Sequence, residues 1–151
     1  MANTQAVCLS WKKQVMSGIH AHDVTVARGD TTVDTFKAAL FLVSATRNKS
    51  DTVYNTTGEV SGTGYTAGGV TVTNGNGVVL TNDVAHWTPS ANFAWTTVTL
   101  STAFDAVLIY NSTQADKAVA VYVFASQTVT AGNFTLTMPT NDDSTGLLRL
   151  N

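Results

Sequence analysis

The residues best suited to bind a metal ion follow the first predicted helix. His20 and His22 are two positions apart, so on an extended backbone both imidazole rings project to the same side. Asp23 comes next, and His86 is the only other histidine in the chain. Because a structural zinc site normally has four ligands, we expect no metal here. We interpret the segment as a polar connection that leaves the helix.

Side chains that could act in catalysis are scattered along the chain. Most carboxylates lie in turn-like segments, where Asp bonds to its own backbone, and Asp105 is expected to have a structural partner. Cys8, the single cysteine, lies on the apolar stripe of the predicted helix, which indicates an inert buried thiol. Neither a G-x-S-x-G nor an H-E-x-x-H motif occurs. We therefore predict a protein that is not an enzyme and uses no cofactor.

A glycine-rich run precedes a short alternating segment. Residues 58–73 read GEVSGTGYTAGGVTVT, with five glycines before the alternation of Val and Thr. Phosphate-binding loops are also rich in glycine, but they lead into a helix and often carry Lys-Ser or Lys-Thr. Here a strand follows, so the run predicts a structured loop with positive φ angles instead.

Three aromatic residues lie close together around Pro89. Trp87, Phe93 and Trp95 fall within nine residues. If they were exposed, they would form a platform that stacks on sugar rings or enters a partner's pocket. Trp95 lies in an alternating strand and is expected in the core, whereas the pattern leaves Trp87 open.

Composition narrows the classes of partner. The chain has 151 residues, a net charge of −2 and only 12% charged residues, about half the usual share. Eight basic residues disfavour nucleic acid, because phosphate contacts dominate that affinity. No apolar run is long enough to cross a membrane, and we expect no secretion signal. The low charge fits two alternatives: a surface covered by protein partners, or a Thr-rich β-protein with a neutral surface.

One amphipathic helix is predicted at the start, over residues 4–19. Asn3 or Thr4 would cap it, and Gly18 lies near its end. We expect it to pack on its own domain, with a neighbouring subunit as the alternative. Its apolar stripe consists of Val7, Cys8, Trp11, Val15, Met16 and Ile19.

The remainder is predicted to be β. Thr35–Val43 is apolar on both faces, as in a central strand. We expect a hairpin between 70–73 and 78–80 around the turn at 74–77, further turns at 82–83 and 111–117, and a polar loop over 126–132. The other predicted strands are 53–54, 84–88, 95–100, 103–110, 119–124 and 134–138.

Short strands separated by turn signals predict a mainly β fold: an antiparallel β-sandwich or barrel with one N-terminal α-helix. We expect a single domain over 1–151, with an N-terminal helical arm (1–22) and a β-sandwich or barrel body (23–151).

Five segments carry a pattern more specific than composition. They are TFKAALFLVSAT (35–46), TGEVSGTGYTAGGVTVTN (57–74), Val84–Trp87, AVLIYN (106–111) and AGNFTLTMPTNDDSTGLLRLN (131–151). Together they resemble a family of small virion proteins of tailed bacteriophages. In that family a strand ending in a Ser-Ala-Thr-like turn precedes a Gly-Glu-Val-x-Gly-x-Gly-Tyr-x-x-Gly-Gly loop, and the chain ends in Gly-x-Leu-x-Leu.

The resemblance implies a non-enzymatic component of the virion, assembled in the cytoplasm of the host bacterium. It implies a capsid decoration (cement) protein that binds the outside of the head, with the major capsid protein of the same phage as its partner. It also implies a symmetric homo-oligomer, with a trimer as the first expectation.

Three elements are the candidate contacts with such a partner. They are the N-terminal helix (Trp11, Lys12, Val15), the glycine loop (Glu59, Tyr65) and the segment around Trp87. One alternative is a structural component of the neck, tail or baseplate. A second alternative is a module that binds host glycans, which would require exposed tryptophans.

Overall fold

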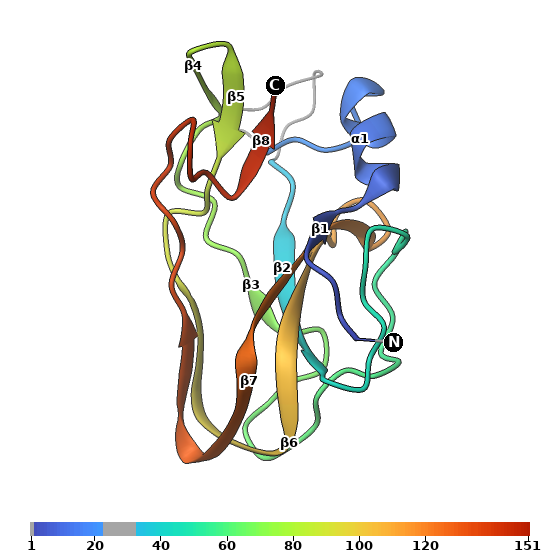
Figure 1. Cartoon of the computed structure of the whole chain (residues 1–151), viewed down its shortest axis with the longest axis vertical. Helices are drawn as coiled ribbons and strands as arrows, with labels where there is room; N and C mark the ends of the chain where they lie inside the picture. Colours follow the sequence, from blue (N-terminus) through green and yellow to red (C-terminus); the bar gives the residue numbers. More distant parts are fainter. Residues whose placement is uncertain (1, 23–32) are drawn as a thin grey trace.

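Two antiparallel sheets and one short helix make up this computed structural model, which describes residues 2–22 and 33–151 (Figure 1). Strands account for 45% of the chain and helix for 6%, which confirms the predicted mainly β, sandwich-like class. The sheet orders are β1-β7-β6-β2-β3 and β4-β5-β8. The elements are β1 (Ala6–Val7), α1 (Leu9–Met16), β2 (Phe36–Leu42), β3 (Val70–Thr71), β4 (Val79–Thr81), β5 (Val84–Trp87), β6 (Phe93–Asn111), β7 (Lys117–Leu136) and β8 (Leu148–Leu150).

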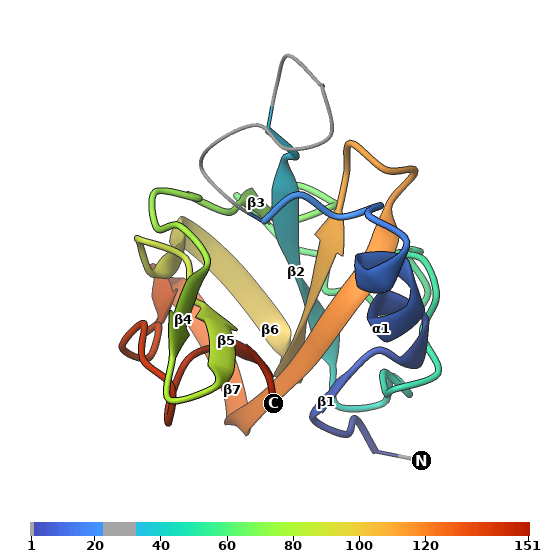
Figure 2. The same cartoon turned by 90° about the horizontal axis from the view of Figure 1, so that it is seen from above.

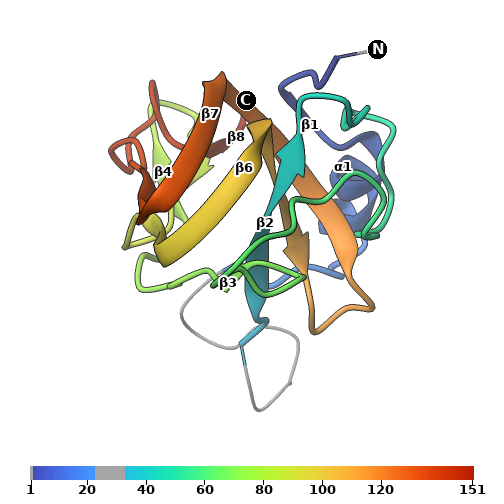
Figure 3. The ribbon, with the colours of Figure 1, turned by 90° about the horizontal axis from the view of Figure 1, so that it is seen from below.

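The long hairpin of β6 and β7 forms most of the body. Its register shifts several times between Trp95 and Ala106. Such irregularities bend a strand and increase its twist. The hairpin therefore turns back on itself at the end of the molecule that lies far from α1 and the small sheet (Figure 1). Figure 3 shows the bent β6 and β7 from that end.

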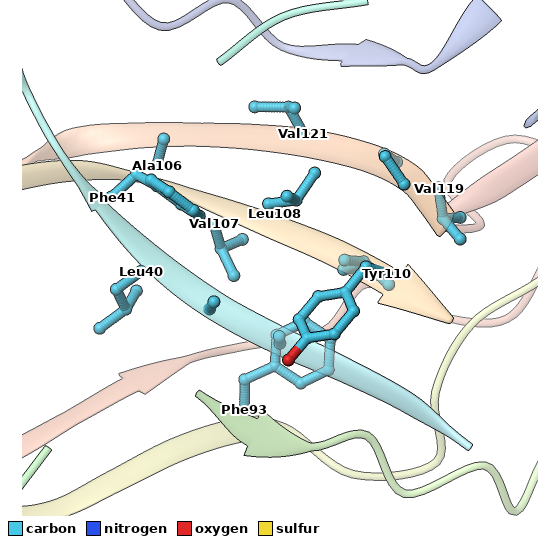
Figure 4. Packing of buried hydrophobic residues seen from close by; sticks show 14 of the residues in the cluster. Leu40, Phe41, Phe93, Ala106, Val107, Leu108, Tyr110, Val119 and Val121 are labelled. Atoms are coloured by element: carbon cyan, nitrogen blue, oxygen red, sulfur yellow. The ribbon is translucent and has the colours of Figure 1, made fainter. Parts of the chain in front are cut away.

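β2 is the central strand of the larger sheet, as predicted. Five of its seven residues are buried, and it pairs with β6 on one side and β3 on the other. Leu40 and Phe41 belong to one buried cluster with Val107, Leu108 and Val121 of β6 and β7 (Figure 4). Because both faces of β2 are covered, its apolar run is continuous rather than alternating.

The predicted N-terminal helix is present, but it begins at Leu9 and not at residue 4. Residues before Leu9 are extended, since Ala6 and Val7 pair with β7 and the N–H of Thr4 donates to the carbonyl of Arg47. Neither Asn3 nor Thr4 caps the helix. Asn3 instead donates to Asp105 (2.6 Å), which confirms a structural partner for that carboxylate.

The end of the helix is as predicted. Gly18 has φ +67°, and its N–H donates to Val15 while the N–H of Ile19 donates to Gln14. This is a Schellman motif, which satisfies the last helical carbonyls. Trp11 is buried in the domain's own core cluster, so the helix packs on its own chain.

The hairpin predicted around 74–77 is wrong. Val70 and Thr71 pair with β2, whereas β4 pairs with β5 around a tight turn at Asn82 and Asp83. Both turn residues have positive φ (48° and 65°), as the favoured two-residue hairpin turn requires. The turn predicted at 82–83 is thereby confirmed.

The polar loop predicted over 126–132 is also wrong. These residues continue β7 and pair with the first half of β6, through contacts such as Leu100 with Val129. Their side chains are mostly exposed, so they lack the apolar alternation that marks a strand in sequence. Backbone pairing across the hairpin holds them in the sheet.

Candidate functional site

A buried cluster of rings surrounds His22. Its imidazole stacks on Phe36 with ring centroids 4.4 Å apart and planes within 11°, and it lies 4.9 Å from the ring of Trp87. Trp11 meets it edge-on at 5.8 Å. These residues come from four separate parts of the chain, so the cluster exists only in the folded protein.

The hydrogen bond from Trp11 fixes the protonation of His22. The Nε1–H of Trp11 donates to Nε2 of His22 over 3.0 Å. An indole nitrogen only donates, so Nε2 must be the unprotonated acceptor and the imidazole proton resides on Nδ1. Burial, with a smaller effect from neighbouring His20, lowers the pKa of His22 to about 3, against a weaker opposing effect of Asp34. The ring is therefore neutral at pH 7.

A polar network places the segment that carries His22. The side-chain amide of Asn111 donates to Oδ2 of Asp34 (2.8 Å) and lies 3.0 Å from Nδ1 of His20. The backbone N–H of Ala21 donates to the same Asp34 oxygen over 2.7 Å. Together these bonds tie residues 20–22 to the end of β6.

A pocket of about 210 Å³ opens beside this cluster, between α1 and the small sheet. In Figure 2 these two elements lie on opposite sides of one end of the molecule. We call this cavity the His22 pocket. Its lining residues are Trp11, Val15, His20, Ala21, His22, Val78, Ala85, His86, Trp87, Leu148, Arg149 and Leu150.

The histidines do not form a metal site within the described ranges. No group of three or more His, Cys, Asp or Glu residues there is arranged to hold an ion. His86 instead contacts Asn141 (3.2 Å) and Thr81 (3.3 Å) through its two ring nitrogens. Asp23, the third candidate from the sequence, lies outside the described residues.

The buried, neutral state of His22 predicts acid sensitivity. The unfolded chain binds a proton at the ordinary pKa of 6.5, whereas the folded ring resists protonation down to about 3. The stabilisation that comes from this pKa difference is therefore fully present above pH 6.5. Below it the free energy of unfolding falls by about 1.4 kcal/mol per pH unit, between pH 6.5 and 4. Urea unfolding at several pH values should show this slope. In His22→Phe the slope should be smaller by the contribution of one titrating proton, about 1.4 kcal/mol per pH unit. An unchanged slope in that variant would contradict the assignment.

The glycine loop is held by a single carboxylate. Oε1 of Glu59 accepts from the Tyr65 hydroxyl and from the N–H of Gly68, both at 2.7 Å, and Oε2 accepts from the Tyr54 hydroxyl at 2.6 Å. The Tyr65 oxygen also accepts from the N–H of Leu40 in β2. Burial, followed by the bond to Glu59, raises the pKa of Tyr54 and of Tyr65.

A third feature is an exposed surface without charge, at the bend of the β6–β7 hairpin. Residues 84–104 and 118–141 contain no Asp, Glu, Lys or Arg. At the bend both strands expose small polar and apolar side chains to solvent. The bend surface, as we name it, consists of Thr96, Thr97, Ser101, Thr102, Ala125, Ser126, Gln127, Thr128, Thr130 and Ala131.

The candidate contact residues do not form one surface. Trp11 and Trp87 are each only 2% exposed, so neither is available to a partner, contrary to expectation. The sequence did not predict their burial, because whether a tryptophan is buried depends on segments that are far away in the sequence. Lys12 is exposed on α1, and Val15 is half-buried in the lining of the His22 pocket.

Glu59 and Tyr65 lie in the glycine loop. The Tyr65 hydroxyl donates to Glu59, and its oxygen accepts from the N–H of Leu40 in β2. Their polar groups are used within the chain, so they position the loop. The bend surface was missed, although the sequence contains its signal: two long stretches without charge that pair with each other.

Cys8 and Trp95 are both buried, as predicted from the sequence. The thiol of Cys8 is fully buried, and burial raises its pKa to about 12. Such a thiol is not a nucleophile at neutral pH. Trp95 is 4% exposed and belongs to the core cluster.

Within the described residues, no helix is both long and apolar enough to cross a bilayer. Comparison of the chain with protein-family models, with curated proteins and with solved structures found no match.

Proposed function

We propose that this protein is a non-enzymatic structural component of a tailed-bacteriophage virion, and that it is a capsid decoration (cement) protein. The observation that carries the proposal is the bend surface. Water-facing protein surfaces normally carry many charged residues, whereas the centres of protein interfaces are depleted of them. An exposed strand surface with no charge, of Thr, Ser, Gln and Ala, is suited to be covered by another protein.

In this proposal the protein works by burying surface. The bend surface binds the major capsid protein on the outside of the head, and a trimer presents three such surfaces at once. An interface of standard size buries about 1,600 Å² in total. Several linked contacts bind much more tightly than one, so even modest individual contacts would bridge neighbouring capsid subunits and stabilise the shell.

The sequence resemblance supports the same role and supplies the class of partner. The glycine-loop motif that carries it has a structural task here, since Glu59 ties Tyr54, Tyr65 and Gly68 together. The test is to mix the purified protein with expanded heads of its own phage and measure co-sedimentation and the heat resistance of the heads. Failure to bind or to stabilise those heads would count against the proposal.

Two substitutions should separate binding from stability. Thr102→Asp and Thr128→Asp each place a charge on the bend surface, on opposite strands of the hairpin, where both side chains are exposed. A charge buried without a partner in an interface is costly, so we expect head binding to weaken about ten-fold or more for each. The melting temperature should stay nearly unchanged, as is usual for exposed positions.

The matched control is Ala115→Asp in the turn between β6 and β7. Ala115 is exposed and has φ +52°, a conformation that Asp tolerates better than most residues. This variant adds the same charge to the same hairpin, away from the bend. It should bind heads normally; an equal loss of binding would show that net charge, not the bend surface, matters.

A neck, tail or baseplate position is the second candidate, since a charge-free surface would serve assembly there as well. Immunogold labelling of intact particles separates head from tail. The glycan-binding alternative loses its basis, because it required exposed Trp87 and Trp95, and these are 2% and 4% exposed.

A further inference from the structure

The small sheet has a free edge at β4. This strand is last in the order β4-β5-β8, and it lies on the outer side of β5 in both Figure 1 and Figure 2. All three of its residues are exposed, and residues 70–81 contain no charge. Edge strands of soluble proteins usually carry a charge, a proline or a bulge that prevents pairing with another chain. β4 has none of these features.

The exposed apolar side chains concentrate on this sheet. Of the eight large hydrophobic residues that are exposed in the described part of the chain, four lie in it or directly before it: Val78 (44%), Val79 (41%), Leu80 (72%) and Leu150 (41%). Leu80 pairs with Ala85, and Ala85 pairs with Leu150, so these three side chains share one face. Val79 projects to the other face. The free edge is therefore apolar on both sides.

The backbone of Leu80 points away from the rest of the small sheet. Thr81 and Val84 flank the two-residue turn, and residues in these positions form a hydrogen-bonded pair. Bonded and non-bonded pairs alternate along an antiparallel ladder, so Leu80 and Ala85 form a non-bonded pair. The N–H and C=O of Leu80 therefore face outward, where the sheet has no further strand. An extended strand of another chain could bond to both groups.

β4 of a second copy matches this edge. Antiparallel pairing about a two-fold axis at Val79 sets Val79 opposite its own equivalent, and Leu80 opposite Val78 of the second copy. Leu80 and that Val78 then exchange backbone hydrogen bonds, and apolar side chains meet on both faces. A shift of two residues in either direction would set Asn76 or Asn82 against an apolar residue, and a shift of one would reverse the faces.

The distribution of charge also suits pairing of identical chains. Asp83, in the turn after β4, is the nearest charged residue along the chain. In an antiparallel pair the two copies of Asp83 lie at opposite ends of the contact. Like charges placed directly opposite each other destabilise a sheet, and this arrangement avoids them.

We propose that two copies of this protein pair through β4 and join their small sheets into one continuous antiparallel sheet. The pairing does not depend on the virion role. A trimer has no two-fold axis, so in the proposed decoration protein this contact would join copies of neighbouring trimers. Two short strands make a smaller contact than a standard interface of about 1,600 Å², so the pair is weak and depends on concentration.

Cysteine cross-linking tests the position of the axis. In Val79→Cys the two new thiols face each other in a non-bonded pair, whose Cα atoms are about 4.5 Å apart, and a disulfide spans this separation. Mild oxidation should yield disulfide-linked dimers. Val53→Cys is the matched control, because Val53 is 43% exposed and Val79 is 41% exposed. It should cross-link at least about ten-fold more slowly, and the native Cys8 is fully buried.

Sedimentation at increasing concentration, up to about 1 mM, tests the association itself. Leu80→Lys places a charge on the free edge, as natural edge strands do, and should weaken association about ten-fold or more. Val53→Lys adds the same charge at a similarly exposed position elsewhere and should associate like the wild type. Both variants should keep nearly the same melting temperature, since both positions are exposed.

Amide hydrogen exchange locates the new hydrogen bonds. Exchange at Leu80 should become slower as the protein concentration rises, because its N–H is bonded only in the pair. Val79 is the internal reference, since its N–H faces β5 in either state. Equal molar masses of wild type and Leu80→Lys at every concentration, or equal cross-linking of Val79→Cys and Val53→Cys, would overturn the proposal. Exchange at Leu80 that does not respond to concentration would do the same.

Discussion

Replacement of Gly69 by alanine should cost about 4 kcal/mol or more of unfolding free energy. A Cβ atom there would lie 1.8 Å from the carbonyl oxygen of Ala38 and 2.6 Å from Cα of Ala39, both in the backbone of β2. Gly69 also has φ +72°, which alone disfavours a side chain. Neither β2 nor the loop can yield cheaply, because β2 is the buried central strand. Urea unfolding measures the loss.

Gly132→Ala is the matched control in β7. A Cβ there would find its nearest atom, Cγ1 of Val129, at 3.4 Å, which is an ordinary contact, and its φ is not positive. We expect a change within about 0.5 kcal/mol. If the two variants lost equal stability, close packing of the glycine loop on β2 would not be the reason for this cluster of glycines.

Removal of the Glu59 carboxylate should have the second largest effect. Glu59→Ala deprives the two tyrosine hydroxyls and the N–H of Gly68 of their acceptor. Hydrogen bonds to a charged group contribute about 1.5–3 kcal/mol each when buried, and this site is half-buried, so we expect a total loss of about 3 kcal/mol. Thermal or urea unfolding gives the total.

Two comparisons make this prediction specific. Glu59→Gln keeps one carbonyl acceptor and should lose about 1 kcal/mol. Thr56→Ala, two residues before the loop, should change little, since that side chain is exposed. Hydrogen exchange of the Gly68 amide should accelerate in Glu59→Ala before that of the core strands. Exchange that stays slow at Gly68 would show that the glycine loop is held by other contacts.

The sequence was a good guide wherever local pattern and tertiary role agree. Thr35–Val43 was predicted as a central strand, and β2 occupies almost the same range, because burial on both faces selects an unbroken apolar run. Gly18 ended the helix as expected, since a Schellman motif needs one residue with positive φ.

The wrong secondary-structure predictions share one cause: the segment pairs with a strand or loop that is far away in the sequence. Residues 4–8 have helical periodicity, yet a strand and a loop more than forty residues away hold them extended. Residues 126–132 look like a loop, yet β6 lies opposite them. The ring cluster at His22 could not be foreseen either, because Trp11, Phe36 and Trp87 are far apart in sequence and contact the His22 ring only in the folded protein.

The place of β1 has a consequence for synthesis of the chain. Ala6 and Val7 pair with Val121 and Ala120, and the N–H of Cys8 donates to Val119. More than 110 residues separate each of these pairs, so residues 6–8 can take their place only after the start of β7 has been translated. Contacts between residues so far apart in sequence close large loops and slow folding. We therefore expect β1 to join the sheet late in folding.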